Sequence, residues 1–300
     1  MPVHEHLPAS WPLALRHFLA GMLGKSVYLT QLHGKSGAAV WRLGDDEPRS
    51  VIIKQADTPN EAHFYRDVAP ALRAEGIPVP EAWEMFQQGD THWLVLEDIP
   101  LSLPAHDPTI QARQVTILAH LHSLPRTILP AMFDGFKPGW SPELTDKALA
   151  CLPADITAQL RPVLEALQNQ AQPLFQPQAI TSGDPNPTNW GLRSDGTPVL
   201  FDWERITQAA PAIDLAIIVA GLGTARQFAD IAQLYRTKRD AIQQPYNTRA
   251  EQLARQIALA KVWTVIEYLG LYTDGTLPPD ATLDYITTHI ADWLVSLELA

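Results

Sequence analysis

The stretch TSGDPNPTNWGLRSDGTPVLFDWE, residues 181–204, decides the interpretation of the whole chain. It carries three polar side chains that can do chemistry: Asp184, Asn189 and Asp202. Asp195-Gly196 lies between two apolar runs, and this dipeptide favours a two-residue type I′ turn because both central positions need positive φ. The stretch therefore predicts a β-hairpin that turns at Asp195-Gly196.

The residue pairing in this hairpin indicates a metal site. A turn of this kind sets Asn189 directly opposite Asp202, with their Cβ atoms ~4.5–5.5 Å apart. Two oxygen ligands at that separation can share one hard divalent cation at ~2.1 Å. Asp184 lies in the loop that leads into the first strand, so we expect a free carboxylate beside the metal.

The spacing of these residues is similar to that of the protein kinase active site, which has a loop Asp, a nearby Asn and an Asp after the next strand. The segments GDPNPTN (183–189), LFDWE (200–204) and PAIDLA (211–216) resemble the aminoglycoside phosphotransferase and choline kinase family. The resemblance implies an α+β, two-lobed protein-kinase-like fold. It also implies Asp184 as catalytic base, Asn189 and Asp202 as Mg²⁺ ligands, and Asp214 as a structural acid that holds the loop.

Two residues depart from the family pattern. Ser182 stands where the family usually has His, and Asn186 stands where His is common. A serine hydroxyl can replace one hydrogen bond of an imidazole but not its bulk. We therefore expect Ser182→His to leave activity equal or higher.

Composition limits the partners and the cellular compartment that the protein can have. The 300 residues carry a net charge of −11, which argues against a nucleic-acid partner and suits small neutral or cationic ones. A single cysteine, Cys151, excludes an internal disulfide and fits a reducing cytosol. No basic and apolar leader precedes the first helix, and no apolar run approaches ~20 residues. We expect a cytoplasmic protein that does not span a membrane; its oligomeric state is not predicted.

The first hundred residues predict a small lobe built mostly of strands. Apolar alternation predicts strands at 26–32, 38–43, 50–55, 82–88 and 92–99, and helices at 11–24 and 59–75. We expect an N-terminal nucleotide-binding lobe over residues 1–100. The resemblance implies that Ser36 and Gly37 face the phosphates, and that backbone groups at Glu97 and Ile99 bond the adenine.

Lys54 is the candidate phosphate-binding lysine. Val51-Ile52-Ile53-Lys54 resembles the kinase V-A-I-K strand, whose Lys contacts the α and β phosphates. Glu61, on the next helix, is its expected ion-pair partner. Thr58-Pro59-Asn60-Glu61 also fits a capping box, so two roles for Glu61 stay open.

The rest of the chain predicts a helical C-terminal lobe, residues 101–300, for catalysis and acceptor binding. Helices are expected near 108–124, 141–151, 154–173, 211–222, 224–242, 247–271 and 280–298. His120 and His122 are two residues apart and do not share a helix face, so a structural role is expected for His122. Trp263 and Glu267 do share a face and could bind a cationic acceptor. The alternative is that Trp263 is core and Glu267 pairs with a basic residue.

Together these features predict an ATP-dependent phosphotransferase that uses Mg²⁺ and acts on a hydroxyl of a small molecule. Amino alcohols, aminoglycosides and sugars stay open as acceptors, and GTP stays open as the donor. A protein substrate is disfavoured because no long activation segment follows Asp202. The alternative is a catalytically silent nucleotide-binding module, which Ser182 in place of His suggests.

Overall fold

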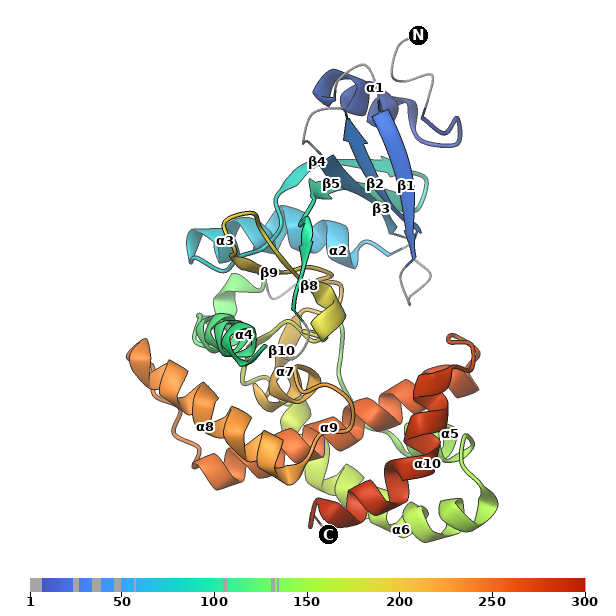
Figure 1. Ribbon diagram of the computed structural model, residues 1–300, viewed down its shortest axis with the longest axis vertical. Coiled ribbons are helices and arrows are strands. Elements are labelled where there is room, and N and C mark those ends of the chain that lie inside the picture. Colours follow the sequence, from blue (N-terminus) through green and yellow to red (C-terminus); the bar gives the residue numbers. More distant parts are fainter. Residues whose placement is uncertain are drawn as a thin grey trace. The chain divides into compact units, whose positions relative to one another are not determined.

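The structure is a computed structural model that describes residues 7–23, 27–33, 39–45, 50–56, 58–104, 107–130, 133 and 135–299 (Figure 1). The chain divides into two compact units. The first contains Met1–Ser102 and Gly191–Glu204, and the second contains Leu103–Trp190 and Arg205–Ala300. The boundary expected near Pro100 lies close to Ser102, where the first segment of this unit ends, whereas Gly191–Glu204 was expected in the C-terminal lobe.

The first unit is built on a five-stranded antiparallel sheet, as expected, and its strands lie in the order β1-β2-β3-β5-β4. Its strands are β1 (Val27–His33), β2 (Ala39–Asp45), β3 (Ser50–Ala56), β4 (Ala82–Gln88) and β5 (Thr91–Glu97). Successive side chains of a strand point to opposite faces of a sheet. Ile53 and Gln55 therefore point to one face of β3, and Lys54 points to the other.

Helix α1 (Leu13–Met22) covers the face that Ile53 shares. Leu15 and Leu19 of this helix are fully buried and pack with Leu43 and Ile53 in one apolar core. Three further members of this core, Trp11, Trp93 and Val95, come from the segment before α1 and from β5.

A second helical segment begins near the end of β3. It consists of α2 (Asn60–His63), a π-helical turn (Phe64–Val68) and α3 (Ala69–Ala74). Pro70 lacks the N–H that would bond one turn back, which accounts for the wider turn before it. Gly76, at φ 79°, ends the segment, because a left-handed residue there lets Ile77 N–H bond the Leu72 carbonyl at 2.9 Å.

The hairpin of residues 191–204 forms, but with a different turn. Arg193 N–H donates to Thr197 O at 3.0 Å, and Gly196 N–H donates to Arg193 O at 2.8 Å. This is a three-residue loop closed by Gly196 at φ 80°, and Asp195 Oδ1 stabilises it by accepting from Thr197 N at 2.8 Å. The predicted two-residue turn is wrong, and the register argument that paired Asn189 with Asp202 fails with it.

Short strands attach this hairpin to the first unit. β6 (Leu101–Ser102), β8 (Trp190–Leu192) and β9 (Pro198–Leu200) form a small sheet in the order β6-β8-β9. Gly191 is required there because a Cβ would meet the Ile99 side chain at 2.6 Å. Arg193 also clamps Glu97, with Nε and Nη2 lying 2.6 Å and 2.8 Å from its two carboxylate oxygens.

The second unit is helical and follows the predicted pattern. Its helices are α4 (Pro108–Leu121), α5 (Pro142–Leu149), α6 (Ala154–Ala171), α7 (Ala212–Ile217), α8 (Ala225–Ala241), α9 (Ala250–Thr273) and α10 (Ala281–Ser296). Helix α9 packs against α5, α6, α7 and α8, so it is apolar on several sides (Figure 1). A two-stranded sheet of β7 (Ala179–Thr181) and β10 (Thr207–Ala209) was not predicted. In the described part of the chain no helix is long and apolar enough to cross a membrane.

Candidate active site

A buried ammonium lies between two carboxylates in the first unit. Lys54 Nζ is 2.6 Å from Glu61 Oε2 and 2.7 Å from Asp202 Oδ1. Although burial disfavours the charged form, the carboxylates of Glu61 and Asp202 raise the pKa of Lys54 above its ordinary value. Lys54 is therefore a fixed positive charge at neutral pH, as a phosphate ligand needs to be.

The structure decides between the two roles left open for Glu61. Its side chain is 2% exposed and pairs with Lys54. At the start of α2, no side chain of a described residue caps the helix. The ion-pair prediction is confirmed, and the capping box does not form.

Asp202 has an unusual backbone conformation. Its φ is 65°, in the left-handed region that residues other than glycine seldom occupy. Trp203 holds the segment, because its ring stacks on Phe64 with centroids 4.9 Å apart and its Nε1–H donates to Leu200 O at 2.8 Å. Backbone strain of this kind is often found at functional sites.

The candidate catalytic loop belongs to the second unit and is held by Asp214. Ser182 N–H and Gly183 N–H donate to the two Asp214 oxygens at 2.8 Å and 2.9 Å. The structural role predicted for Asp214 is confirmed. Gly183 has φ 80°, and a Cβ there would overlap the Arg205 carbonyl, so the turn before Asp184 requires glycine.

A chain of hydrogen-bonded, buried side chains leads from Asp214 into the second unit. His122 Nε2 lies 3.0 Å from Asp214 Oδ2, and His122 Nδ1 lies 3.2 Å from Tyr235 Oη. Arg239 Nη1 donates to Tyr235 Oη at 3.1 Å. With Tyr235 accepting from Arg239, its own O–H is free to donate to His122 Nδ1, and Nε2–H then donates to Asp214. His122 is structural, as predicted; Tyr235 and Arg239 were missed.

Asn189 contacts the candidate base. Its Nδ2 donates to the Asp184 carboxylate at 3.0 Å and to the Asp184 carbonyl at 3.1 Å. The side-chain oxygen of Asn189 is the atom that suits Mg²⁺. Among the described residues no cluster of three or more His, Cys, Asp or Glu side chains could hold a metal. Asn189 belongs to the second unit and Asp202 to the first, so the Mg²⁺ site expected from these two side chains stays a prediction.

Of the four other residues predicted to contact the nucleotide, the structure describes two, Glu97 and Ile99. Ser36 and Gly37 lie outside the described residues. Glu97 directs its side chain to Arg193, and its backbone N–H donates to Glu81 O at 2.8 Å. The adenine contact expected of the backbone at Glu97 and Ile99 stays a prediction.

The predicted acceptor pair is wrong in its geometry. Trp263 is fully buried; it packs edge-on against Phe175 at 5.2 Å and donates Nε1–H to Gly139 O at 2.9 Å. Glu267 is held by Arg205, whose Nη2 lies 2.7 Å from Oε2 and 2.8 Å from Oε1. The alternative given above therefore holds: Trp263 is core and Glu267 is half of an ion pair.

The buried position of Ser182 reverses the expectation for Ser182→His. Ser182 is 2% exposed, and its Oγ lies 3.2 Å from the same Asp214 oxygen that His122 contacts. An added imidazole overpacks this site, which typically costs about 1–3 kcal/mol. We expect a lower unfolding temperature and a lower kcat for this variant. Ser182→Ala, which adds no bulk, is the control; a Ser182→His protein as stable as wild type would contradict the prediction.

Lys261 makes stability depend on pH. It is buried in α9, and its Nζ donates to the carbonyls of Val219 at 2.6 Å and Ala216 at 3.2 Å, near the end of α7. Burial lowers the pKa of Lys261 from 10.5 to about 8. Between these values the unfolded chain binds the extra proton, so stability rises with pH.

Unfolding in urea measures this effect. From about pH 7.5 to about pH 9.5, the free energy of unfolding of wild type should rise by about 2 kcal/mol relative to Lys261→Met. Lys238→Met, on α8, is the control and should follow wild type. If the free energy of unfolding changes with pH in the same way for wild type and Lys261→Met, then Lys261 does not cause the pH dependence.

A five-stranded antiparallel sheet with a Lys–Glu ion pair, followed by a helical unit with an anchored Asp loop, defines the protein-kinase-like fold. The chain belongs to the phosphotransferase enzyme family, whose family model matches residues 29–269. No curated protein matches the chain in sequence.

Solved structures agree on the fold. A spectinomycin phosphotransferase, in complex with ADP and spectinomycin, is similar at 12% identity with a TM-score of 0.67, over 98% of this chain and 100% of the other. The choline kinase LicA from Streptococcus pneumoniae is similar at 16% identity and TM-score 0.60, over 94% and 98%. The Plasmodium vivax ethanolamine kinase is similar at 12% identity and TM-score 0.57, over 88% and 81%.

Proposed function

We propose that the protein is an ATP-dependent phosphotransferase that moves the γ-phosphate to a hydroxyl of a small molecule. The observation that carries this proposal is the Lys54–Glu61 ion pair at 2.6 Å. Kinases need this pair in place before transfer, because it fixes the lysine that binds the phosphates. Family membership and the nucleotide named with the spectinomycin phosphotransferase support the same function.

Each remaining residue receives a role in this proposal. Asp184 orients the acceptor hydroxyl and takes its proton. Asn189 and Asp202 would hold Mg²⁺, which neutralises charge on the phosphates. Ser36, Gly37 and the backbone at Glu97 and Ile99 would bind the nucleotide. A cytoplasmic location is part of the proposal and rests on the single cysteine.

The chemical class of the acceptor is a small molecule with a free hydroxyl. The similar solved structures are, by their names, a spectinomycin phosphotransferase, a choline kinase and an ethanolamine kinase. We extend this range to amino alcohols, aminoglycosides and sugars. Since Glu267 pairs with Arg205, the pair of Trp263 and Glu267 no longer favours a cationic acceptor over a neutral one.

A catalytically silent module is the second candidate, motivated by Ser182. The structure weakens that motive, since the Ser182 hydroxyl and backbone N–H both reach Asp214. The loop is anchored without the missing imidazole of residue 182. We therefore favour the enzyme.

ADP release tests the proposal. Purified protein is mixed with Mg²⁺ and ATP and screened against alcohols, amino alcohols, sugars and aminoglycosides. We expect at least one acceptor to raise the rate of ADP release at least ~10-fold above the rate with water alone. Nucleotide binding without stimulation by any acceptor would favour the silent module.

A further inference from the structure

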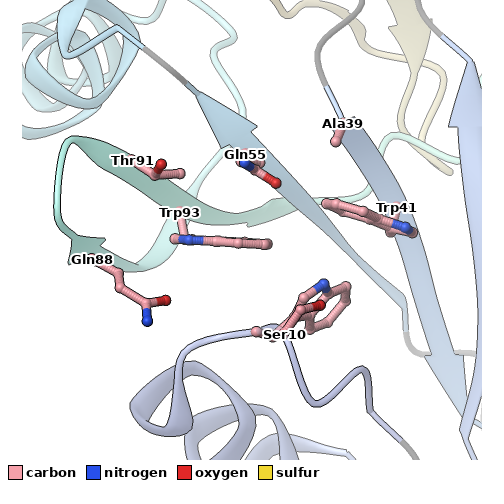
Figure 2. A pocket seen from close by; sticks show the side chains of 8 residues that line it. Ser10, Ala39, Trp41, Gln55, Gln88, Thr91 and Trp93 are labelled. Carbon is pink, nitrogen blue, oxygen red and sulfur yellow. The ribbon is translucent and has the colours of Figure 1, made fainter.

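The two units differ in how their polar side chains are satisfied. In the first unit, Ser10 and Gln88 line a depression beside the rings of Trp41 and Trp93 (Figure 2). Both polar residues are exposed, so water satisfies them and the depression indicates no ligand. In the second unit, by contrast, several polar side chains are buried and depend on one another for their hydrogen bonds.

One chain of such hydrogen bonds joins a buried cation to a buried anion. Arg239, on α8, is 8% exposed, and Asp214, on α7, is fully buried. In the part of the chain that the structure describes, Arg239 pairs with no carboxylate, and Asp214 pairs with no lysine or arginine. Burying a charge without compensation is costly. The two side chains that connect these charges, Tyr235 and His122, therefore matter to both of them.

The direction of each hydrogen bond follows from the donors present. Among the described residues the Tyr235 hydroxyl has two partners, Arg239 Nη1 at 3.1 Å and His122 Nδ1 at 3.2 Å. A guanidinium can only donate, so the Tyr235 O–H donates to Nδ1. Burial raises the pKa of Tyr235 above its ordinary value, so the hydroxyl keeps this proton. His122 is then a neutral ring with its proton on Nε2.

All of these hydrogen bonds run in one direction, from the positive end to the negative end. His122 Nε2–H donates to Asp214 Oδ2 at 3.0 Å, and aligned hydrogen bonds of this kind polarise and strengthen one another. Asp214 in turn accepts from the backbone N–H groups of Ser182 and Gly183 at 2.8 Å and 2.9 Å. These two residues directly precede Asp184. The chain thus connects α8 with the loop of the candidate base.

Contacts outside the chain fix its positive end. Arg239 Nε donates to the Gln244 carbonyl at 2.7 Å, and the Gln244 N–H donates back to the Arg239 carbonyl at 3.0 Å. The guanidinium carbon also lies 5.7 Å from the centroid of the Tyr246 ring, which is within the range of cation–π attraction. An arginine held in this way can orient the Tyr235 hydroxyl.

We propose that Tyr235 and Arg239 are positioning residues for phosphoryl transfer. Through the Tyr235 hydroxyl they hold His122 as the neutral ring that donates from Nε2. That donor keeps Asp214 in the orientation that binds the loop before Asp184. Both positioning residues are buried, so they act through the loop and not on the reactants. Their effect on turnover rests on the proposed function, whereas the state of the His122 ring does not.

Nitrogen NMR of the full chain tests the His122 ring without any measurement of activity. The wild-type ring should carry a proton on Nε2 and none on Nδ1. Tyr235→Phe keeps the aromatic ring and loses only the hydroxyl. In this variant the Nδ1 resonance should shift, because Nδ1 no longer accepts a hydrogen bond. A proton on Nδ1 of the wild-type ring would overturn the proposal, whether or not any variant folds.

Hydrogen exchange and kinetics test the effect on the loop. In Tyr235→Phe the amides of Ser182 and Gly183 should exchange at least ~10-fold faster than in wild type, which corresponds to about 1.4 kcal/mol. Amides of α6 should change less. With the acceptor found by ADP release, kcat should fall at least ~10-fold while KM for ATP stays within about threefold. A role in packing alone would lower the unfolding temperature and leave kcat unchanged.

Tyr246→Phe is the matched control. The Tyr246 ring packs edge-on against Tyr235, with centroids 5.4 Å apart, and its hydroxyl is hydrogen-bonded to Thr248. The control therefore loses a neighbouring hydroxyl that does not contact His122. Its kcat and the exchange of the Ser182 and Gly183 amides should match wild type.

Two further results would overturn the proposal. The first is a folded Tyr235→Phe protein with wild-type kcat and wild-type exchange at Ser182 and Gly183. The second is that Tyr246→Phe changes kcat and exchange as much as Tyr235→Phe does. If the protein phosphorylates no acceptor, the proposed function fails on its own. Faster exchange at the two loop amides of Tyr235→Phe would then still support the positioning role, and unchanged exchange would still overturn it.

Discussion

Replacing Asp184 with asparagine is expected to lower kcat at least ~1,000-fold, a loss of about 4 kcal/mol in transition-state stabilisation. Asparagine keeps the size of the side chain but cannot accept the proton of the acceptor hydroxyl. General-base catalysis typically contributes 10²–10⁴-fold, so a loss of this size fits the role. The contact with Asn189, at 3.0 Å, can persist through the amide oxygen.

Two measurements separate this loss from a loss of binding or folding. Calorimetry should find the affinity for Mg²⁺ and ATP unchanged within about threefold. Asp195→Asn removes the same charge from the hairpin loop and keeps an oxygen for Thr197 N–H, so its kcat should match wild type. Asp184→Asn activity within tenfold of wild type would remove Asp184 from the role of base.

Replacing Asp214 with asparagine is expected to reduce both stability and turnover. Asp214 is fully buried and accepts from Ser182 N–H, Ser182 Oγ, Gly183 N–H and His122 Nε2 within 3.2 Å. An asparagine amide has one oxygen, and its NH₂ group would face a buried donor. Leaving a buried donor unpaired costs about 1–3 kcal/mol.

Because Asp214 positions the loop and does not touch the reactants, its variant has a distinct kinetic signature. At a temperature where Asp214→Asn is folded, kcat should fall more than ~10-fold, while KM for ATP stays within about threefold. Asp292→Asn, exposed on α10, is the control and should change stability by less than about 0.5 kcal/mol. A stable Asp214→Asn protein with full kcat would show that the loop does not need this anchor.

The helices and strands were predictable because the sequence of each one carries its own local pattern. Strand alternation placed β1–β5, and Gly76 ended α3 at a residue that needs positive φ. The turn at 194–196 was not predictable from Asp195-Gly196 alone. The same dipeptide also fits a three-residue loop with Gly196 as its left-handed residue, and the Asp195 side chain favours that loop by accepting from Thr197 N–H.

The site was predictable where residues are close in sequence and not where they meet through packing. Asp184 and Asn189 are five residues apart; the sequence proposed both, and the structure places their side chains in hydrogen-bond contact. Tyr235 and Arg239 reach His122 from a helix more than 100 residues away, and nothing local marks them. Arg205 is separated from Glu267 by 62 residues, so their pairing could be anticipated only as one alternative.

Direct detection of the phosphorylated acceptor tests the central claim most directly. The acceptor found in the ADP screen is incubated with γ-labelled ATP and Mg²⁺, separated, and analysed by mass spectrometry. The proposed function predicts that wild type adds one labelled phosphoryl group to the acceptor for each ADP released, and that Asp184→Asn forms no product on the same timescale. Release of ADP and free phosphate with an unlabelled acceptor, or equal product from both proteins, would contradict it.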